Sequence, residues 1–149
     1  MKLKYWLYES FTALLALLFL FTALSKLMDF RIYLHEMKSQ PFDKVFTAIL
    51  IYCLPVVEIL TALLLVVPKT RFKGLILSFV LMMAFTIYVS LITFHFFRQV
   101  PCSCAGVFHH MTWLQHLLFN LFFTAIAVWG VYLHNLINAQ KTLASTNGQ

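Results

Sequence analysis

The sequence predicts an all-α integral membrane protein, built as a bundle of four transmembrane helices. Hydrophobic residues make up 62% of its 149 residues and charged residues only 11%, whereas a soluble domain carries about 25% charged residues. The apolar residues gather in four long runs that lack the alternation of barrel strands. This composition excludes an ordinary soluble enzyme, a disordered chain and a nucleic-acid-binding protein, and it makes the lipid bilayer the expected surroundings of the chain.

Each apolar run is long enough to cross the hydrocarbon core, which takes about 20 residues of helix. The runs cover residues 6–27, 45–67, 74–97 and 114–137. Because an α-helix satisfies its own backbone hydrogen bonds in lipid, four packed helices over residues 1–137 form the simplest membrane domain. Residues 138–149 are polar and have no apolar period, so we expect them to form a disordered tail.

The first run also permits another interpretation. Lys2 and Lys4 precede it, and residues 23–25 (Ala-Leu-Ser) resemble the small-residue cleavage site of a signal peptide. Cleavage there would leave three spans. We favour the uncleaved form, because the run is long for a signal peptide and Glu9 lies near its start.

The orientation in the membrane follows from the distribution of basic residues, which accumulate on the cytoplasmic side. Residues 68–73, between the second and third runs, include three basic residues and no acidic one. With four spans, this loop lies on the same side as both termini. We therefore expect both termini of the chain in the cytoplasm.

Two residues within the second run are unusual for a membrane span. Glu58 lies near the middle of the run, three residues after Pro55. An ionised carboxylate at that depth needs a partner or takes up a proton, and Lys26 at the end of the first run is the nearest candidate by depth. We interpret Glu58 and Lys26 as structural intramembrane residues, with a proton relay as the alternative. Cys53 has apolar neighbours and is expected to be an inert, buried thiol.

The third and fourth runs each carry a stripe of polar and small residues at helical spacing. Such stripes usually face the bundle interior, where they form interhelical hydrogen bonds. We expect the two stripes to pack against each other. The stripe residues are Met82, Thr86, Ser90 and Thr93 in the third run, and Trp113, His116, Asn120, Thr124 and Ala127 in the fourth.

The segment between the third and fourth runs contains two cysteines separated by one residue, Cys102 and Cys104. A disulfide in so small a ring is strained and restricts the unfolded chain little, which argues against a structural role. A strained, exposed disulfide is easily reduced and suits an electron-passing pair. Arg98, His109 and His110 lie close in sequence and favour the reactive thiolate.

Two other interpretations of the cysteines remain open. Two thiols, two imidazoles and Met111 form a soft ligand set able to hold Cu(I) or Zn, although their spacing matches no closed zinc motif. In a non-enzymatic assembly factor or small subunit of a membrane complex, the cysteines would be incidental. Replacement of either cysteine by serine distinguishes the redox role, which requires both thiols, from the assembly factor, which should tolerate serine at either position. Metal handling predicts instead that His109 and His110 matter as much as the thiols.

With these residues the chain resembles the MauE/DoxX-type redox-associated membrane proteins. The matching segments are Leu-Ser-Lys-Leu-Met-Asp-Phe at residues 24–30, Leu-Pro-Val-Val-Glu at 54–58, Cys-Ser-Cys-Ala-Gly at 102–106, and then Trp113. The family pattern usually reads Cys-Gly-Cys-Phe-Gly, so Ser103 and Ala105 depart from it. These departures concern the shape of the loop more than the chemistry of its thiols.

The resemblance implies a DoxX-like four-helix protein of the bacterial inner membrane, with Cys102 and Cys104 on the periplasmic side. It links the chain to disulfide formation or maturation of exported proteins. We expect the cysteine pair to act as a thiol–disulfide oxidoreductase toward a thioredoxin-like or cysteine-containing exported protein. A quinone is the candidate cofactor, with His95, Arg98 and His116 as its polar lining.

Overall fold

The computed structural model describes residues 2–40, 42–94 and 112–146, and these form five helices without a strand. The helices are α1 (Lys2–Met28), α2 (Phe30–Lys38), α3 (Lys44–Val66), α4 (Arg71–Thr93) and α5 (Trp113–Thr146). All of them except α2 are long and apolar enough to cross a membrane. The predicted fold class, an all-helical protein with four spans, is confirmed.

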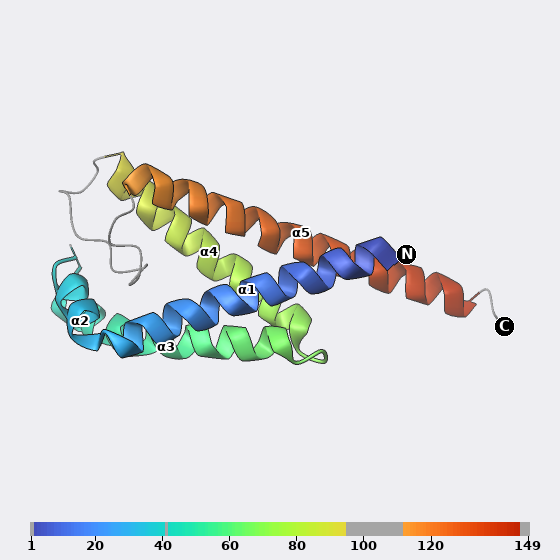
Figure 1. Ribbon diagram of the computed structural model, residues 1–149, viewed down its shortest axis with the longest axis horizontal. Helices are drawn as coiled ribbons and strands as arrows, with labels where there is room; N and C mark the ends of the chain where they lie inside the picture. The colour runs from blue at the N-terminus through green and yellow to red at the C-terminus, as the bar shows by residue number, and fades with distance from the viewer. Residues whose placement is uncertain (1, 41, 95–111, 147–149) are drawn as a thin grey trace.

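The four long helices pack as two antiparallel pairs, α1 with α3 and α4 with α5 (Figure 1). The N-terminus, the turn between α3 and α4, and the C-terminal end of α5 lie at one end of the bundle, which we call the termini end. The last residues of α4 and the first of α5 lie at the opposite end, together with α2. We call this second end the α2 end.

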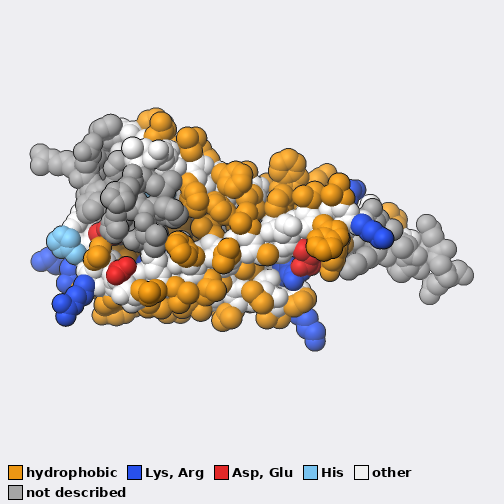
Figure 2. Space-filling model, viewed as in Figure 1, with side chains coloured by type: hydrophobic (Ala, Val, Ile, Leu, Met, Phe, Trp, Pro, Cys, Tyr) orange, Lys and Arg blue, Asp and Glu red, His pale blue; other side chains and the backbone are white. Residues whose placement is uncertain are grey.

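The core of the bundle is apolar and draws on all four long helices. Its most deeply buried members are Leu15 and Phe19 of α1, Leu65 of α3, Leu75 of α4 and Ala127 of α5. The outer surface is apolar as well. Figure 2 shows hydrophobic side chains across the middle of the molecule, with most Lys, Arg, Asp and Glu side chains toward its two ends. A surface of this kind is stable when lipid, not water, surrounds it.

The helix α2 was not predicted from the sequence. It begins directly after Asp29 and packs Tyr33 and Met37 against Ile51 of α3. Its opposite face exposes Arg31 and Lys38. Nine residues of mixed polarity give too short a periodic signal to separate a helix from a loop. The structure thus adds an amphipathic helix at the α2 end.

Two other expectations require correction. The helix α5 continues to Thr146, so most of the tail expected to be disordered from residue 138 is helical. Residues 138–146 contain no Gly or Pro and several good helix formers, which lets the helix extend beyond its packed part.

Cys53 is exposed on the outside of α3, not buried. The third span ends at Thr93, and residues 95–97 of its expected range lie outside the described residues.

The turn between α3 and α4 brings the two backbones unusually close. Thr70 Oγ1 donates to the Leu64 carbonyl and Arg71 Nε donates to the Leu65 carbonyl, both at 3.1 Å. A Cβ atom placed on Gly74 would lie 2.8 Å from the Leu65 nitrogen and 2.9 Å from the Leu64 carbonyl carbon. Because both neighbours are backbone atoms, the helices would have to separate to admit any side chain.

We predict that Gly74→Ala destabilises the bundle although alanine is the better helix former. Overpacking of a tight contact costs about 1–3 kcal/mol, which exceeds the gain of about 1 kcal/mol in helix propensity. Gly130→Ala is the matched control, because its new methyl group would meet only the flexible side chain of Leu75. Unfolding in detergent should show a loss for the first variant and little change for the second. Equal effects would contradict the close approach of α3 and α4.

Candidate functional site

An ion pair between Lys26 of α1 and Glu58 of α3 lies inside the bundle. The Lys26 Nζ atom donates to both carboxylate oxygens of Glu58, at 2.8 Å to Oε1 and 3.0 Å to Oε2. Each side chain exposes 1% of its surface. The pairing that the sequence suggested is therefore present, and both charges are removed from the surroundings of the protein.

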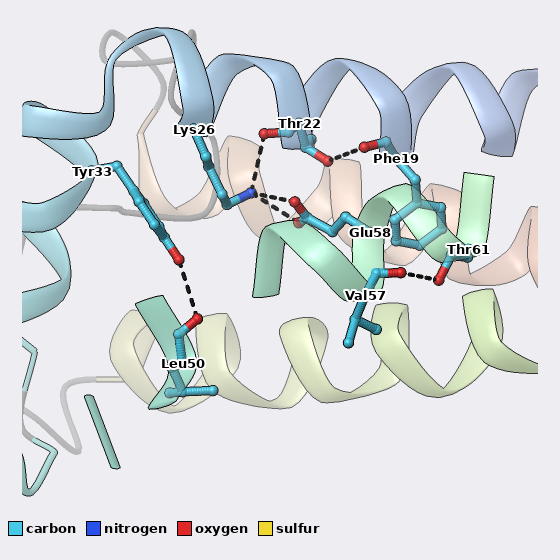
Figure 3. A network of polar contacts seen from close by, with 8 residues as sticks. All are labelled: Phe19, Thr22, Lys26, Tyr33, Leu50, Val57, Glu58 and Thr61. Atoms are coloured by element: carbon cyan, nitrogen blue, oxygen red, sulfur yellow. Dashed lines mark hydrogen bonds and ion pairs between the residues drawn. The ribbon is translucent and has the colours of Figure 1, made fainter. Parts of the chain in front are cut away.

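The directions of the side chains explain how these two residues meet. Side chains on an α-helix lean toward its N-terminus. Lys26 accordingly reaches back along α1, where its Nζ atom also donates to the Thr22 carbonyl at 3.4 Å. Since α3 runs antiparallel to α1, Glu58 leans the opposite way and meets the ammonium group between the two helices (Figure 3).

The backbone of α3 is altered one turn before Glu58. Pro55 has no N–H group to donate to the Ile51 carbonyl, so the helix lacks one of its hydrogen bonds there. The adjacent carbonyl of Leu50 accepts a hydrogen bond from Tyr33 Oη of α2 at 3.4 Å (Figure 3). The helix α2 is therefore fixed to α3 close to the stretch that the proline modifies.

Further polar side chains of α1 and α5 are buried toward the α2 end. His116 of α5 is buried. Ser25 adjoins Lys26 in the sequence, and Asn120 lies one helical turn after His116. The Ser25 Oγ and Asn120 Nδ2 atoms are buried and find no hydrogen-bond partner in the described part of the chain. We call Ser25, Lys26, Glu58, His116 and Asn120 the polar cluster.

The predicted stripes of α4 and α5 do face each other. The hydroxyl groups of Thr86 and Thr124 lie 3.1 Å apart across the two helices. Met82 of α4 is buried with them, as are His116 and Asn120 of α5. The prediction of an interhelical polar contact is therefore confirmed for the central part of both stripes.

Most of the residues expected to carry redox chemistry fall outside the described residues. Cys102, Cys104, His95 and Arg98 all belong to residues 95–111. His116 is described, and it is buried at the α2 end of α5. Within the three described ranges, no group of three His, Cys, Asp or Glu side chains is arranged to hold a metal ion.

Sequence reasoning missed a second polar site at the termini end. Arg71 Nη1 of α4 donates to Glu9 of α1 at 2.5 Å, and its guanidinium lies 5.7 Å from the centre of the Tyr8 ring. Tyr8 Oη and Nδ1 of His134 are 3.0 Å apart, and the His134 ring stacks on Phe72 with 4.6 Å between centres. The only signal in the sequence is an acid near the start of the first run and a base just before the third, and their meeting depends on the packing of the helices.

These observations first define a class of protein: a multi-pass α-helical membrane protein with a buried ion pair between its first and second spans. The family model described as methylamine utilisation protein MauE matches residues 4–133. The chain therefore belongs to the MauE family, as its resemblance suggested. No curated protein and no solved structure matches the chain significantly.

We predict that the loss of one partner of the ion pair lowers the free energy of unfolding far more than the loss of both partners. Lys26→Met or Glu58→Leu leaves one buried charge unpaired and should lower the free energy of unfolding by about 3–5 kcal/mol. The double variant leaves an apolar contact and should recover most of this loss. Unfolding in detergent measures all three variants, with exposed Lys69→Met as the control. Additive losses in the double variant would argue that the two residues act independently.

Proposed function

We propose that the protein is a thiol–disulfide redox protein of the bacterial inner membrane, in which Cys102 and Cys104 exchange electrons with other proteins. The chemistry is the conversion of two thiols into one disulfide, which releases two electrons and two protons. The proposed protein partner is a thioredoxin-like or cysteine-containing exported protein. The cysteine pair is proposed to serve disulfide formation or maturation of such proteins.

The observation that carries this proposal is the position of the two described residues that flank residues 95–111. The end of α4 and the start of α5, next to Phe94 and Thr112, both lie at the α2 end, opposite the two termini (Figure 1). Each cysteine is eight residues from the nearer of these anchors, and eight residues span at most about 29 Å. The 23 residues of α4 are about 34 Å long. This short reach supports the proposal that both thiols stay on the α2 side of the membrane.

The arrangement of charges supports a periplasmic position for the cysteines. The basic residues of 68–73 lie at the termini end, together with the N-terminus and the end of α5 (Figure 1). Basic residues accumulate on the cytoplasmic side, so we place both termini in the cytoplasm and the α2 end in the periplasm. A disulfide persists far better in the periplasm than in the reducing cytosol.

A quinone is the proposed second electron partner, because its chemistry accepts both the two electrons and the two protons of a dithiol. The polar cluster fits such a group in one respect. Asn120 Nδ2 is a buried donor without a partner in the described residues, and a quinone carbonyl is an acceptor that it suits. His116 would orient the same group, with His95 and Arg98 as further proposed lining. Lys26 and Glu58 are proposed to hold this region together, not to transfer electrons.

We predict that Cys102 and Cys104 react with a membrane-impermeant thiol reagent in intact cells after mild reduction. Their proposed periplasmic position makes them accessible without lysis. The experiment uses a Cys53→Ser protein, which lacks the third thiol. The variant Lys69→Cys is the control for a thiol on the cytoplasmic side. The topology is inverted if the pair reacts only in broken cells while Lys69→Cys reacts in intact ones.

We also predict that the cysteine pair forms a reversible disulfide whose reduction midpoint lies above about −300 mV. The one-residue spacing strains the ring, and strained disulfides are more oxidising than structural ones. Purified Cys53→Ser protein is equilibrated against glutathione buffers, and its free thiols are alkylated and counted by mass. Cys102→Ser and Cys104→Ser should each abolish the redox titration in glutathione buffers. Each should also abolish, in cells, the proposed disulfide formation or maturation of exported proteins.

Two outcomes would contradict the redox proposal. The thiols could remain unpaired in every buffer, or both serine variants could retain full activity in cells. The second outcome would favour the assembly-factor interpretation, in which the cysteines are incidental. If variants of His109 and His110 lose activity in cells while their cysteine pair titrates as in the wild type, metal handling would be favoured instead.

A further inference from the structure

A cavity lies at the corner where α2 ends and α3 begins. It has a volume of about 390 Å³, and its lining consists of Lys38, Phe42, Lys44, Thr47, Ala48 and Ile51. Lys38 is the last residue of α2 and Lys44 the first of α3. Ala48 and Ile51 follow one and two turns farther along α3. The lining thus changes from cationic at the helix ends to apolar toward the middle of the bundle.

This change matches the depth profile of a membrane. The 23 residues of α3 span about 34 Å, slightly more than the hydrocarbon core of about 30 Å. Lys44 therefore lies at the level of the lipid headgroups. Ile51 lies about 10 Å deeper, among the acyl chains. A phospholipid has the same sequence of charge and then hydrocarbon over the same distance.

Both lysines are available to a ligand. In the residues that the structure describes, neither the Lys38 nor the Lys44 ammonium makes a hydrogen bond or an ion pair, and both side chains are exposed. Asp43, which adjoins Lys44 in the sequence, caps α3 by accepting from the Val45 N–H at 3.2 Å. It is not among the residues that line the cavity.

The exposed face of α2 beside the cavity is also basic. Arg31, His35 and Lys38 recur at intervals of four and three residues, so they share the exposed face of α2. Figure 2 shows Lys, Arg and His side chains at this end of the molecule, with Asp and Glu side chains beside them. An amphipathic helix with a basic outer face is typical of contact with the anionic headgroup region.

We propose that this corner binds one anionic phospholipid. The headgroup phosphate pairs with the Lys38 and Lys44 ammonium groups, and an acyl chain lies along Ala48 and Ile51. A free phosphate ion would use the lysines alone and would leave the apolar lining unexplained. The site is independent of the proposed redox function, because it contains none of the residues assigned to that function.

The same corner is linked to α4, which gives the lipid a structural consequence. The Phe42 ring lies 5.6 Å from the Tyr88 ring, centre to centre, and Tyr88 Oη donates to Gln40 Oε1. A lipid held at the cavity contacts Phe42 and thereby stabilises the connection between α2, α3 and the end of α4. Lipid binding should accordingly raise the midpoint of thermal unfolding.

The test compares phosphatidylglycerol with phosphatidylcholine of the same acyl chains, bound to the purified full chain in detergent. Native mass spectrometry measures the affinity and thermal unfolding measures the stabilisation. Each lysine near an anionic headgroup contributes about 1 kcal/mol. Lys38→Gln/Lys44→Gln should therefore weaken phosphatidylglycerol binding about thirtyfold, and its stabilising effect should disappear.

Two further variants make the result specific. Lys69→Gln/Lys73→Gln removes the same charge at the termini end and should leave phosphatidylglycerol binding unchanged. Ala48→Phe fills the apolar part of the cavity without touching the lysines, and it should weaken lipid binding but not the weak binding of glycerol phosphate. Equal affinity of the wild type for the two lipids would overturn the proposal, as would equal losses in the two lysine pairs.

Discussion

The buried ion pair of Lys26 and Glu58 is the constraint on which the arrangement at the α2 end depends. In a low-dielectric interior each of these charges is costly alone, and each is tolerable only because the other lies 2.8 Å away. The pair therefore fixes how far α1 and α3 are displaced along each other. Because α1 ends two residues after Lys26, the same contact sets where the chain turns into α2.

The rest of the bundle is held by contacts that function without a hydrophobic driving force. Helices in lipid gain little by burying apolar side chains, so they associate through close packing and interhelical hydrogen bonds. Gly74 brings α4 against the backbone of α3, and the Thr86 and Thr124 hydroxyls join α4 to α5. Arg71 and Glu9 connect α4 to α1 at the termini end. Polar side-chain contacts thus join α4 to both α5 and α1.

Features that depend on local sequence or on membrane depth were predictable. The four spans follow from run length, and the pairing of Glu58 with Lys26 follows from the rule that a charge in lipid needs a partner. Features that depend on helix register were not. The Arg71–Glu9 contact joins residues 62 positions apart, and no property of either residue identifies the other. The helix α2 was missed because it is short, and the end of α5 because a polar segment without an apolar period gives no periodic signal of a helix.

The midpoint of the disulfide proposed for Cys102 and Cys104, measured in a Cys53→Ser protein that also carries Lys26→Met and Glu58→Leu, tests most directly whether the ion pair is structural. If the ion pair is structural, the variant folds and its dithiol titrates at the wild-type midpoint. A shift of more than about 30 mV would mean that the pair changes the energy of the disulfide by more than about 1.4 kcal/mol. In that case Lys26 and Glu58 would belong to the electron- and proton-transfer site itself.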